Sequence, residues 1–470
     1  MKQYDLTYIT ALSLVSALGG LLFGYDWVVI GGAKPFYEQF FSIAGSPAMQ
    51  GWAISAALIG CIAGSMVSGA MADRFGRKRM LLTAAVLFTV SAAGTGAAHG
   101  FTVFILYRLL GGIGIGIASN LSPVYIAEVT PPALRGRFVS VNQLTIVIGI
   151  LLAQLVNWLI AEPVPEGASA AQILASWNGQ QGWRWMFWAE MVPALFFFLL
   201  MWWVPDSPRW LVREGREERA AAVLRRVGGE AYARQALQEI RETLGNVREK
   251  AEWRVLLSPP VRKMVLVGVV LAVFQQWCGI NVVFMYAEEI FSAAGYSVSD
   301  ILFNIVITGS VNLLFTFVAM ALVDRVGRRV LMLAGAGSLA VIYAVLGLFY
   351  YLGVTGWPML VLVVTAIAAY AMTLAPVTWV VLSEIFPNRV RGAAMAVATF
   401  ALWSANALLA YSFPLINHAV HASGSFWLFA AVSVGGFLFI RRHLTETKGK
   451  SLEEIERMAN DDRSRKTADL

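Results

Sequence analysis

The chain has 470 residues, of which 58% are hydrophobic and only 14% are charged, and its mean hydropathy is +0.65. A soluble protein of this length does not need so much apolar surface, so the composition excludes an ordinary soluble enzyme or binding protein. The net charge of +7 at pH 7 would suit a nucleic-acid partner only if it formed a patch. Because the basic residues instead lie in short segments between apolar runs, we expect a membrane protein with no nucleic-acid partner.

Apolar runs of ~20 residues recur along the chain, and each can cross a hydrocarbon layer of ~30 Å as a helix that rises ~1.5 Å per residue. About twelve such spans are expected. They fall at residues 8 to 30, 51 to 72, 80 to 98, 101 to 127, 137 to 160, 184 to 204, 262 to 293, 300 to 323, 330 to 352, 358 to 386, 391 to 416 and 424 to 442. We interpret the first as a retained span, because no small-residue cleavage site ends it before the next one.

The basic residues that separate the spans lie in short loops on one expected side of the membrane, with Lys34 as the main exception in an opposite loop. This asymmetry is the positive-inside pattern, and it predicts that both termini and the segment 205 to 260 are cytoplasmic. The basic loops would then contact anionic lipid head groups. Cys61 and Cys278 both fall inside expected spans, so neither a disulfide framework nor a cysteine metal site is expected.

A charged loop occurs twice, as Asp73-Arg74-Phe75-Gly76-Arg77 and as Asp324-Arg325-Val326-Gly327-Arg328, each between the second and third spans of its half. A second repeat has the same register, because a glutamate precedes an Arg-Gly pair by seven residues at Glu128 and again at Glu384. A weaker third repeat pairs residues 205 to 209 with residues 445 to 448. Two parallel halves of six spans are typical of transporters that rock one half against the other around a midplane site.

The repeat predicts four parts, namely an N-terminal six-helix half at 1–204, a cytoplasmic helical linker at 205–260, a C-terminal half at 261–443 and a cytoplasmic tail at 444–470. The linker has Glu, Arg, Ala and Leu at helical spacing, which is typical of amphipathic helices. Gly76 and Gly327 permit tight reversals between spans. We hypothesise that the charged groups around them form a cytoplasmic latch, whose members are Asp73, Arg77, Glu128, Arg135, Asp324, Arg328, Glu384 and Arg391.

Several motifs occur together in one order: the two charged loops, Gly182-Trp183-Arg184, Pro205-Asp206-Ser207-Pro208-Arg209, Gln275-Gln276 with Gly279-Ile280-Asn281, and Glu446-Thr447-Lys448-Gly449. With these motifs the chain resembles, over essentially its whole length, the sugar porter family of the major facilitator superfamily. It is most similar to the bacterial proton-coupled xylose symporters and is also similar to facilitative glucose transporters. The resemblance implies the twelve-helix major facilitator fold, a monosaccharide substrate and a place in the bacterial cytoplasmic membrane.

Three ionisable residues fall inside expected spans: Asp26 in span one, Arg108 in span four and Glu190 in span six. Counting at ~1.5 Å per residue from the expected span ends puts all three in the outer third of the membrane, where charge is costly unless it is paired or hydrated. An acid beside an arginine can change its charge and so couple a proton to a conformational change. The resemblance implies the same roles, and a hydrated structural role for Asp26 is the alternative.

The resemblance also implies a sugar site of amides and one aromatic plate, a combination that suits hydroxyl groups and an apolar ring face. Its expected members are Gln143, Gln275, Gln276, Asn281, Asn312 and Trp379, with Phe23, Trp403 and Asn406 as possible lining residues. Interhelical hydrogen bonding is the alternative role for any single amide. A break at Gly279 would bring Gln276 and Asn281 together, and Pro376 would allow a kink before Trp379.

Three residues depart from the pattern of the xylose symporters: Ile150 and Leu402 replace amides, and Met285 replaces a tyrosine. The site therefore has fewer polar partners, which leaves the particular sugar open. The leading function is import of a monosaccharide, a pentose or hexose, by proton symport with alternating access. A facilitative uniporter, a polyol or inositol symporter and a sugar sensor are alternatives. We expect a monomer with no cofactor beyond the co-transported proton, no catalytic residues and no metal site.

Overall fold

The computed structural model of the protein describes residues 4–165, 167–246, 256, 258–386 and 390–446. Every regular element in these ranges is a helix, which confirms the predicted all-α class. The chain forms two compact units, Met1–Lys250 and Ala251–Leu470. The finer division into two halves, linker and tail stays a prediction.

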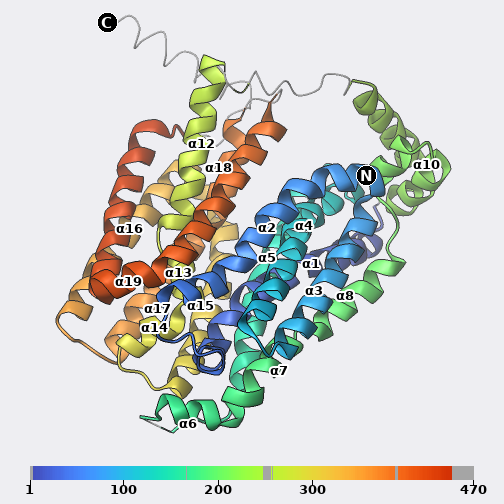
Figure 1. The fold of residues 1–470 in the computed structure, drawn as a ribbon. Helices are drawn as coiled ribbons and strands as arrows, with labels where there is room; N and C mark the ends of the chain where they lie inside the picture. The colour runs from blue at the N-terminus through green and yellow to red at the C-terminus, as the bar shows by residue number, and fades with distance from the viewer. Residues whose placement is uncertain (1–3, 166, 247–255, 257, 387–389, 447–470) are drawn as a thin grey trace, which may run out of the picture. The chain divides into compact units, whose positions relative to one another are not determined.

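The first unit holds the six N-terminal spans and the helices that follow them (Figure 1). Its elements are α1 (Leu6–Phe40), α2 (Pro47–Phe75), α3 (Arg77–Ala97), α4 (Phe101–Val129), α5 (Arg135–Ile160), α6 (Ala170–Ala175), the π-helix η1 (Asn178–Gly182), α7 (Trp183–Trp188), α8 (Met191–Trp203), α9 (Pro208–Arg213) and α10 (Glu217–Asn246). The sixth span is the continuous stretch Asn178–Trp203.

The second unit repeats the order of spans, but its helices are more often interrupted. Its elements are α12 (Pro259–Trp277), α13 (Ile280–Met285), α14 (Ala287–Ala293), α15 (Val298–Val326), α16 (Arg328–Tyr351), α17 (Trp357–Met372), α18 (Leu374–Ile385) and α19 (Arg391–His443). Across the described residues, 11 helical stretches are long and apolar enough to cross a membrane. The last of them contains two helices joined at His421, where φ is 58°, so the described chain holds the twelve predicted spans.

The two charged loops are single-residue reversals in the structure. Gly76 separates α2 from α3 with a φ of 92°, and Gly327 separates α15 from α16 with a φ of 107°. A side chain is rarely tolerated at such angles, whereas glycine adopts them without steric cost. The prediction that these glycines permit tight reversals is confirmed.

Glycines let α2 and α4 pack with their backbones almost in contact. Gly60 on α2 lies opposite Gly112 on α4, such that a Cβ built on Gly60 would be 3.0 Å from the Gly112 Cα. A Cβ on Gly112 would lie 2.7 Å from the carbonyl carbon of Ala57. Small residues at four-residue spacing give membrane helices this close approach, and dispersion contacts then stabilise the pair.

A similar seam joins α1 to α5, and polar side chains reinforce it. Thr145 on α5 donates its hydroxyl to the carbonyl of Ala17 at 2.7 Å, and Asn157 donates its amide to the carbonyl of Val29 at 2.9 Å. These bonds tie α1 to α5 along several turns.

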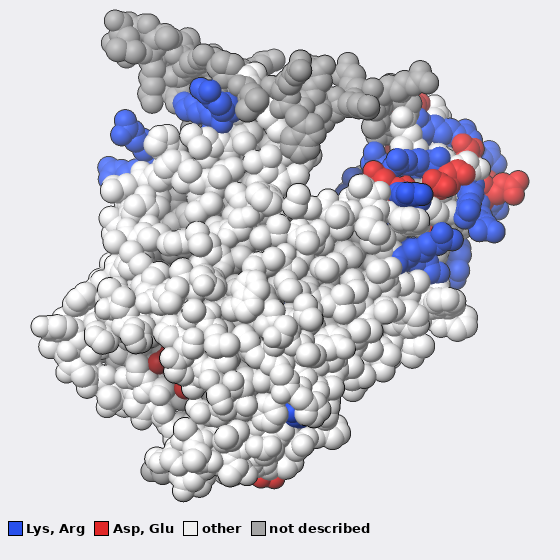
Figure 2. Space-filling view, viewed as in Figure 1, with Lys and Arg blue, Asp and Glu red and all other residues white. Residues whose placement is uncertain are grey.

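Helix α10 packs on the N-terminal end of α1. Its two halves meet at a kink at Gly228 and Gly229. Beside the kink, the carbonyl of Val227 accepts a hydrogen bond from the backbone N–H of Asp5 at 2.9 Å. Tyr232 then meets the ring of Tyr4 edge-on at 5.5 Å, and burial raises the pKa of Tyr232 to about 12, so it stays neutral. Figure 2 shows the charged side chains of the first unit gathered over α10, whereas its apolar helices present an almost uncharged face.

The glycine seam between α2 and α4 yields a stability prediction. We expect Gly60→Leu to lower the free energy of unfolding by at least ~2 kcal/mol, because the added side chain must push α4 away from α2. Gly69→Leu on the same helix is the matched control, since a Cβ at Gly69 meets nothing within 4 Å. Thermal unfolding of both variants in detergent measures the difference. Equal effects of the two substitutions would contradict the proposed seam.

Candidate functional site

A buried ion pair joins α1 to α4. The Arg108 Nη1 atom donates to the Asp26 carboxylate, and its Nη2 atom donates to the Asp26 backbone carbonyl at 3.3 Å. The two side chains are only 2% and 1% exposed. A charge is costly in such surroundings unless it is paired, so each residue makes the burial of the other possible.

The second carboxylate oxygen of Asp26, Oδ2, has no hydrogen-bond partner in the described structure. It lies beside Gly111, where a Cβ would come within 2.8 Å of it. Ser91 also lies beside Gly111, but its hydroxyl donates to the carbonyl of Tyr107 at 2.8 Å. One oxygen of Asp26 is therefore paired with Arg108, and the other has no hydrogen-bond partner among the described residues.

Glu190 lies between α7 and α8 and is 2% exposed. It makes no ion pair with any residue that the structure describes, and its Oε1 atom has no hydrogen-bond partner there. Asp26 and Arg108 are nevertheless the charged groups that act on it. The structure therefore brings two of the three predicted ionisable residues into contact and leaves Glu190 buried close by.

The end inferred for span one from the sequence is wrong. Span one was expected to end at residue 30, but α1 continues to Phe40. Asp26 is thus fourteen residues before the end of α1, or ~21 Å at ~1.5 Å per residue. The helix continues because residues 31 to 40, including Pro35, are mostly buried against other helices, and this packing outweighs their weak apolar pattern.

Lys34 is a further correction, because it lies in α1 and not in an outer loop. It is 1% exposed and pairs with Glu38 at 2.9 Å, one helical turn away. Gln50 donates its amide to the same carboxylate at 3.0 Å. Sequence reasoning missed this buried pair, although the i, i+4 spacing of opposite charges was a usable signal.

The predicted amides of the second unit form a connected chain. Asn281 donates its amide to the Gln276 side-chain oxygen, and Gln276 donates to the Gln275 oxygen at 3.2 Å. Gln275 in turn donates to the Ala375 carbonyl at 3.3 Å, next to the interruption between α17 and α18. All three amides are at most 6% exposed, and each has further hydrogen-bonding capacity for a polar ligand.

The break in span seven is what brings the amides together. Gly279 has a φ of 90° and separates α12 from α13, as the sequence predicted. The ring of Phe429 lies so close that a Cβ at Gly279 would be 2.6 Å from it. Thr373, with φ −125° and ψ −85°, interrupts span ten three residues before Pro376, so the expected kink is present but begins earlier than the proline.

The other predicted sugar-site residues lie on separate helices. Asn312 is on α15 and 6% exposed, Trp379 is half-buried on α18, and Gln143 is half-buried on α5 of the first unit. Of the possible lining residues, Trp403 and Asn406 are buried on α19 and Phe23 is half-buried on α1. The three departures, Ile150, Met285 and Leu402, are each at most 4% exposed.

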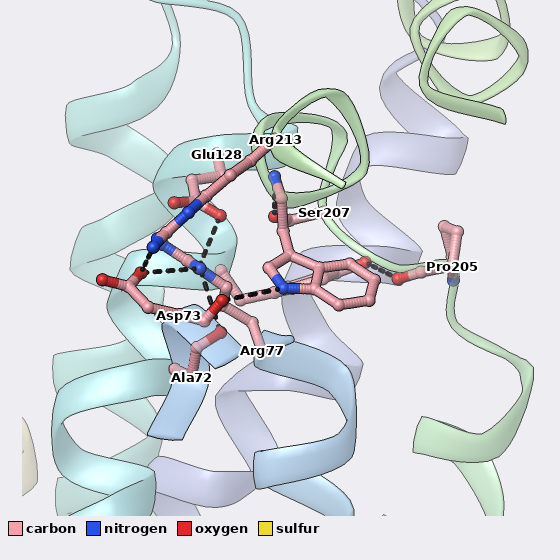
Figure 3. A network of polar contacts seen from close by, with 9 residues as sticks. Ala72, Asp73, Arg77, Glu128, Pro205, Ser207 and Arg213 are labelled. Atoms are coloured by element: carbon pink, nitrogen blue, oxygen red, sulfur yellow. Dashed lines mark hydrogen bonds and ion pairs between the residues drawn. The ribbon is translucent and has the colours of Figure 1, made fainter. Parts of the chain in front are cut away.

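Figure 3 shows the charged loop of the first unit with its partners. Arg77 lies between two carboxylates, with Asp73 at 3.2 Å and Glu128 of α4 at 3.1 Å, and it also donates to the Ala72 carbonyl at 3.1 Å. Arg213 of α9 pairs with the same carboxylate oxygen of Asp73 at 2.9 Å. The loop thereby connects α2, α3, α4 and α9 within one network.

The segment after span six completes this network. Pro205 accepts a hydrogen bond from the Tyr125 hydroxyl at 2.8 Å, and Ser207 caps α9 by accepting from the Trp210 N–H at 3.3 Å. The Trp210 indole donates to the Asp73 carbonyl at 3.2 Å, and its ring covers Gly76. Arg135 stays apart from the carboxylates and donates instead to the Ala127 carbonyl at 3.0 Å, near the end of α4.

The charged loop of the second unit has different partners. Arg328 pairs with Glu384 at 3.2 Å, which parallels Arg77 and Glu128. Glu446 accepts the backbone N–H groups of Arg328 and Arg329 at 2.9 and 3.1 Å, so it caps the start of α16. The side chains of Asp324 and Arg391 lie outside the described residues, as do residues 447–470.

The network around Arg77 gives a second stability prediction. Arg77→Ala leaves Glu128, whose side chain is 11% exposed, without its partner, so we expect a loss of at least ~2 kcal/mol of unfolding free energy. Arg213→Ala is the matched control, because Arg213 and Asp73 are 48% and 47% exposed and such pairs contribute less than ~1 kcal/mol. Thermal unfolding of the two variants compares them. A larger effect at Arg213 would show that burial does not govern this network.

Comparisons with known proteins agree on a family. The family model described as sugar (and other) transporter matches residues 12–459. The chain is 40% identical over 484 residues to the D-xylose-proton symporter of Escherichia coli, covering 97% of this chain and 96% of that protein. It is 37% identical over 458 residues to the arabinose-proton symporter of Bacillus subtilis, covering 97% of this chain and 96% of the relative.

A solved structure also matches. The inward-open xylose transporter XylE from Escherichia coli aligns with a TM-score of 0.84 and 38% sequence identity, over 96% of this chain and 100% of that one. Sequence identity of this size over nearly the whole length of both chains shows that they share both the fold and the family. The protein is a membrane transporter of the sugar transporter family, with the major facilitator fold, and not an enzyme.

Proposed function

We propose that the protein imports a monosaccharide, a pentose or hexose, together with a proton across the bacterial cytoplasmic membrane. The observation that carries this proposal is the buried Asp26–Arg108 pair, in which one carboxylate oxygen is bound and the other is free. A sugar carrier without coupling has no need for a charged pair at this depth. The names of the two symporter relatives point in the same direction.

The coupling follows from the energetics of a buried charge. While Asp26 is ionised, its attraction to Arg108 holds α1 against α4. Protonation removes that attraction, and α1 can then move relative to α4, which changes the balance between outward-facing and inward-facing states. Glu190, buried close to the pair, is the second acid that can receive or release the proton.

The sugar is bound, in this proposal, by Gln143 of the first unit and by Gln275, Gln276, Asn281, Asn312 and Trp379 of the second. Support comes from the amide chain in the second unit, whose members are buried and hydrogen-bonded to one another. Amides both donate and accept hydrogen bonds, so these three side chains can pair with a sugar hydroxyl that acts as donor or as acceptor. The tryptophan supplies an apolar plate for the ring face.

The remaining parts of the chain are proposed to support alternating access. Residues 1–204 and 261–443 form the two moving halves, residues 205–260 link them in the cytoplasm, and residues 444–470 form a cytoplasmic tail. The charged loops act as latches on the cytoplasmic side, where basic residues also meet anionic lipid head groups. The protein works as a monomer without a cofactor.

A facilitative uniporter is the main alternative, and a polyol or inositol symporter is another. The loss of amides at Ile150 and Leu402 favours a change in the preferred substrate over a loss of coupling, because neither residue lies in the ion pair.

Reconstitution in liposomes tests the proposal. With an inward proton gradient imposed, we expect accumulation of a radiolabelled pentose or hexose above the external concentration, and Asp26→Asn should abolish accumulation while exchange persists. Asp300→Asn, an exposed carboxylate at the start of α15, is the matched control and should accumulate normally. Accumulation by the Asp26 variant would exclude the coupling role, and accumulation of inositol alone would exclude a monosaccharide substrate.

The latch is tested in the same liposomes. Asp73→Asn and Arg77→Ala each weaken the network around the first charged loop, so we expect transport rates to change by at least ~2-fold, corresponding to ~0.4 kcal/mol in the barrier. The amount of correctly inserted protein is measured in parallel. Unchanged rates in both correctly inserted variants would exclude the latch.

A further inference from the structure

Tyr25, the residue before Asp26, has a buried hydroxyl that takes no part in the ion pair. Its side chain is 1% exposed, and the hydroxyl has no hydrogen-bond partner in the described structure. The Oε1 atom of Glu190 is also buried and also has no partner among those residues. A buried donor and a buried acceptor are each costly when they are unpaired, so a shared role would account for both.

The direction of Tyr25 on α1 follows from its two neighbours. Residues in an α-helix are ~100° apart around the axis, so Tyr25 points between the directions of Gly24 and Asp26. A Cβ at Gly24 would meet the backbone of Ile146 on α5, and Asp26 binds Arg108 on α4. Helix α7 packs against both α1 and α5, so its C-terminal end is the part of the bundle that Tyr25 can reach.

The level of Tyr25 along the bundle matches that of Glu190. Helix α8 runs antiparallel to α1, because α10, which packs on the N-terminal end of α1, follows the C-terminal end of α8 through α9 (Figure 1). A Cβ at Gly19 of α1 would lie 3.4 Å from the Cζ atom of Phe197 on α8. From that contact Tyr25 is six residues along α1, or ~9 Å. Glu190 is seven residues in the same direction along α8, or ~10.5 Å.

The electrostatic contacts agree with this placement. Glu190 is the charged group that acts on the Tyr25 hydroxyl, and Asp26 and Arg108 act on Glu190. The guanidinium of Arg108 also lies over the ring of Phe187 at 5.7 Å, and Phe187 is about one turn before Glu190. The titratable and charged groups around Glu190 in the described structure are therefore Tyr25 and Asp26 of α1 and Arg108 of α4, with Cys61 of α2 close to Asp26.

We propose that Tyr25 is a positioning residue for proton transfer, whose hydroxyl donates a hydrogen bond to Glu190 whenever that carboxylate is ionised. The inference rests on the proposed sugar–proton symport and adds a residue to its proton path. When the proton passes from the Glu190 carboxyl to the unpaired Oδ2 atom of Asp26, the negative charge moves to Glu190. The Tyr25 O–H keeps its own proton and stabilises that charge. When the proton returns to Glu190, the charge-assisted bond is lost.

Proton-driven accumulation of radiolabelled D-xylose and D-glucose by Tyr25→Phe in liposomes tests the proposal. The substitution removes only the hydroxyl, so Glu190 ionises less readily, and we expect accumulation to slow by about tenfold. With the proton gradient held constant, the pH of half-maximal accumulation on the acid side should rise, because a higher pH is needed to remove the proton from Glu190. Sugar exchange needs no net proton movement and should change by less than ~2-fold.

Tyr343→Phe is the matched control. Tyr343 on α16 is fully buried, and its hydroxyl also has no partner among the described residues. The groups that act on it are Cys278 and Tyr370 and not a carboxylate, so the substitution should leave accumulation, exchange and the pH profile unchanged. Thermal unfolding in detergent should be the same for both variants and the unchanged protein, since each loses only an unpaired hydroxyl.

Two results would overturn the role of Tyr25. One is an equal loss of accumulation and exchange, which would indicate a structural defect, and the other is a pH profile that does not move. Failure of the unchanged protein to accumulate any monosaccharide would instead overturn the proposed function.

Discussion

A charge buried among apolar side chains must be neutralised where it stands, and in this protein that constraint ties α1 to α4. Asp26 and Arg108 are almost fully buried, and the glycine at position 111 leaves room for the second carboxylate oxygen. The seams on either side of the pair, α2 with α4 and α1 with α5, use glycines and short polar side chains to hold the backbones close. The ion pair thus lies between closely packed helices, and the proposed coupling would transmit a change in its charge to those helices.

The two units differ in their first helices and in the partners of their charged loops. In the first, α1 is unbroken and carries Asp26 of the charged pair, whereas the matching helix of the second is interrupted at Gly279 and carries neutral amides. The repeated charged loops also differ, because the ring of Trp210 covers Gly76 while the Glu446 carboxylate caps the helix that follows Gly327. In each unit the segment after the last span binds the loop between the second and third. Trp210 makes this contact in the first unit and Glu446 makes it in the second.

Prediction from the sequence succeeded where the signal was local or repeated, and it failed where packing decides. Gly76, Gly327 and Gly279 marked reversals and a break, because few other residues adopt a φ near +90°. The end of span one was placed too early, since the residues up to Phe40 are held helical by burial and not by their apolar pattern. The same error put Lys34 in a loop, although it is buried beside Glu38.

The sequence by itself determined the class of protein, the twelve spans and the internal repeat. Hydropathy, glycine positions and charged motifs are local properties of the chain, so they can be identified without knowing how the helices pack. It also marked Asp26 and Arg108, since ionisable residues in apolar spans are rare. Only the tertiary structure decided which of these groups touch: Arg108 binds Asp26 while Glu190 stays apart, and Gln276 reaches Asn281 across a broken helix. Contacts between residues far apart in the chain depend on how the helices pack, and a local sequence pattern does not determine that packing.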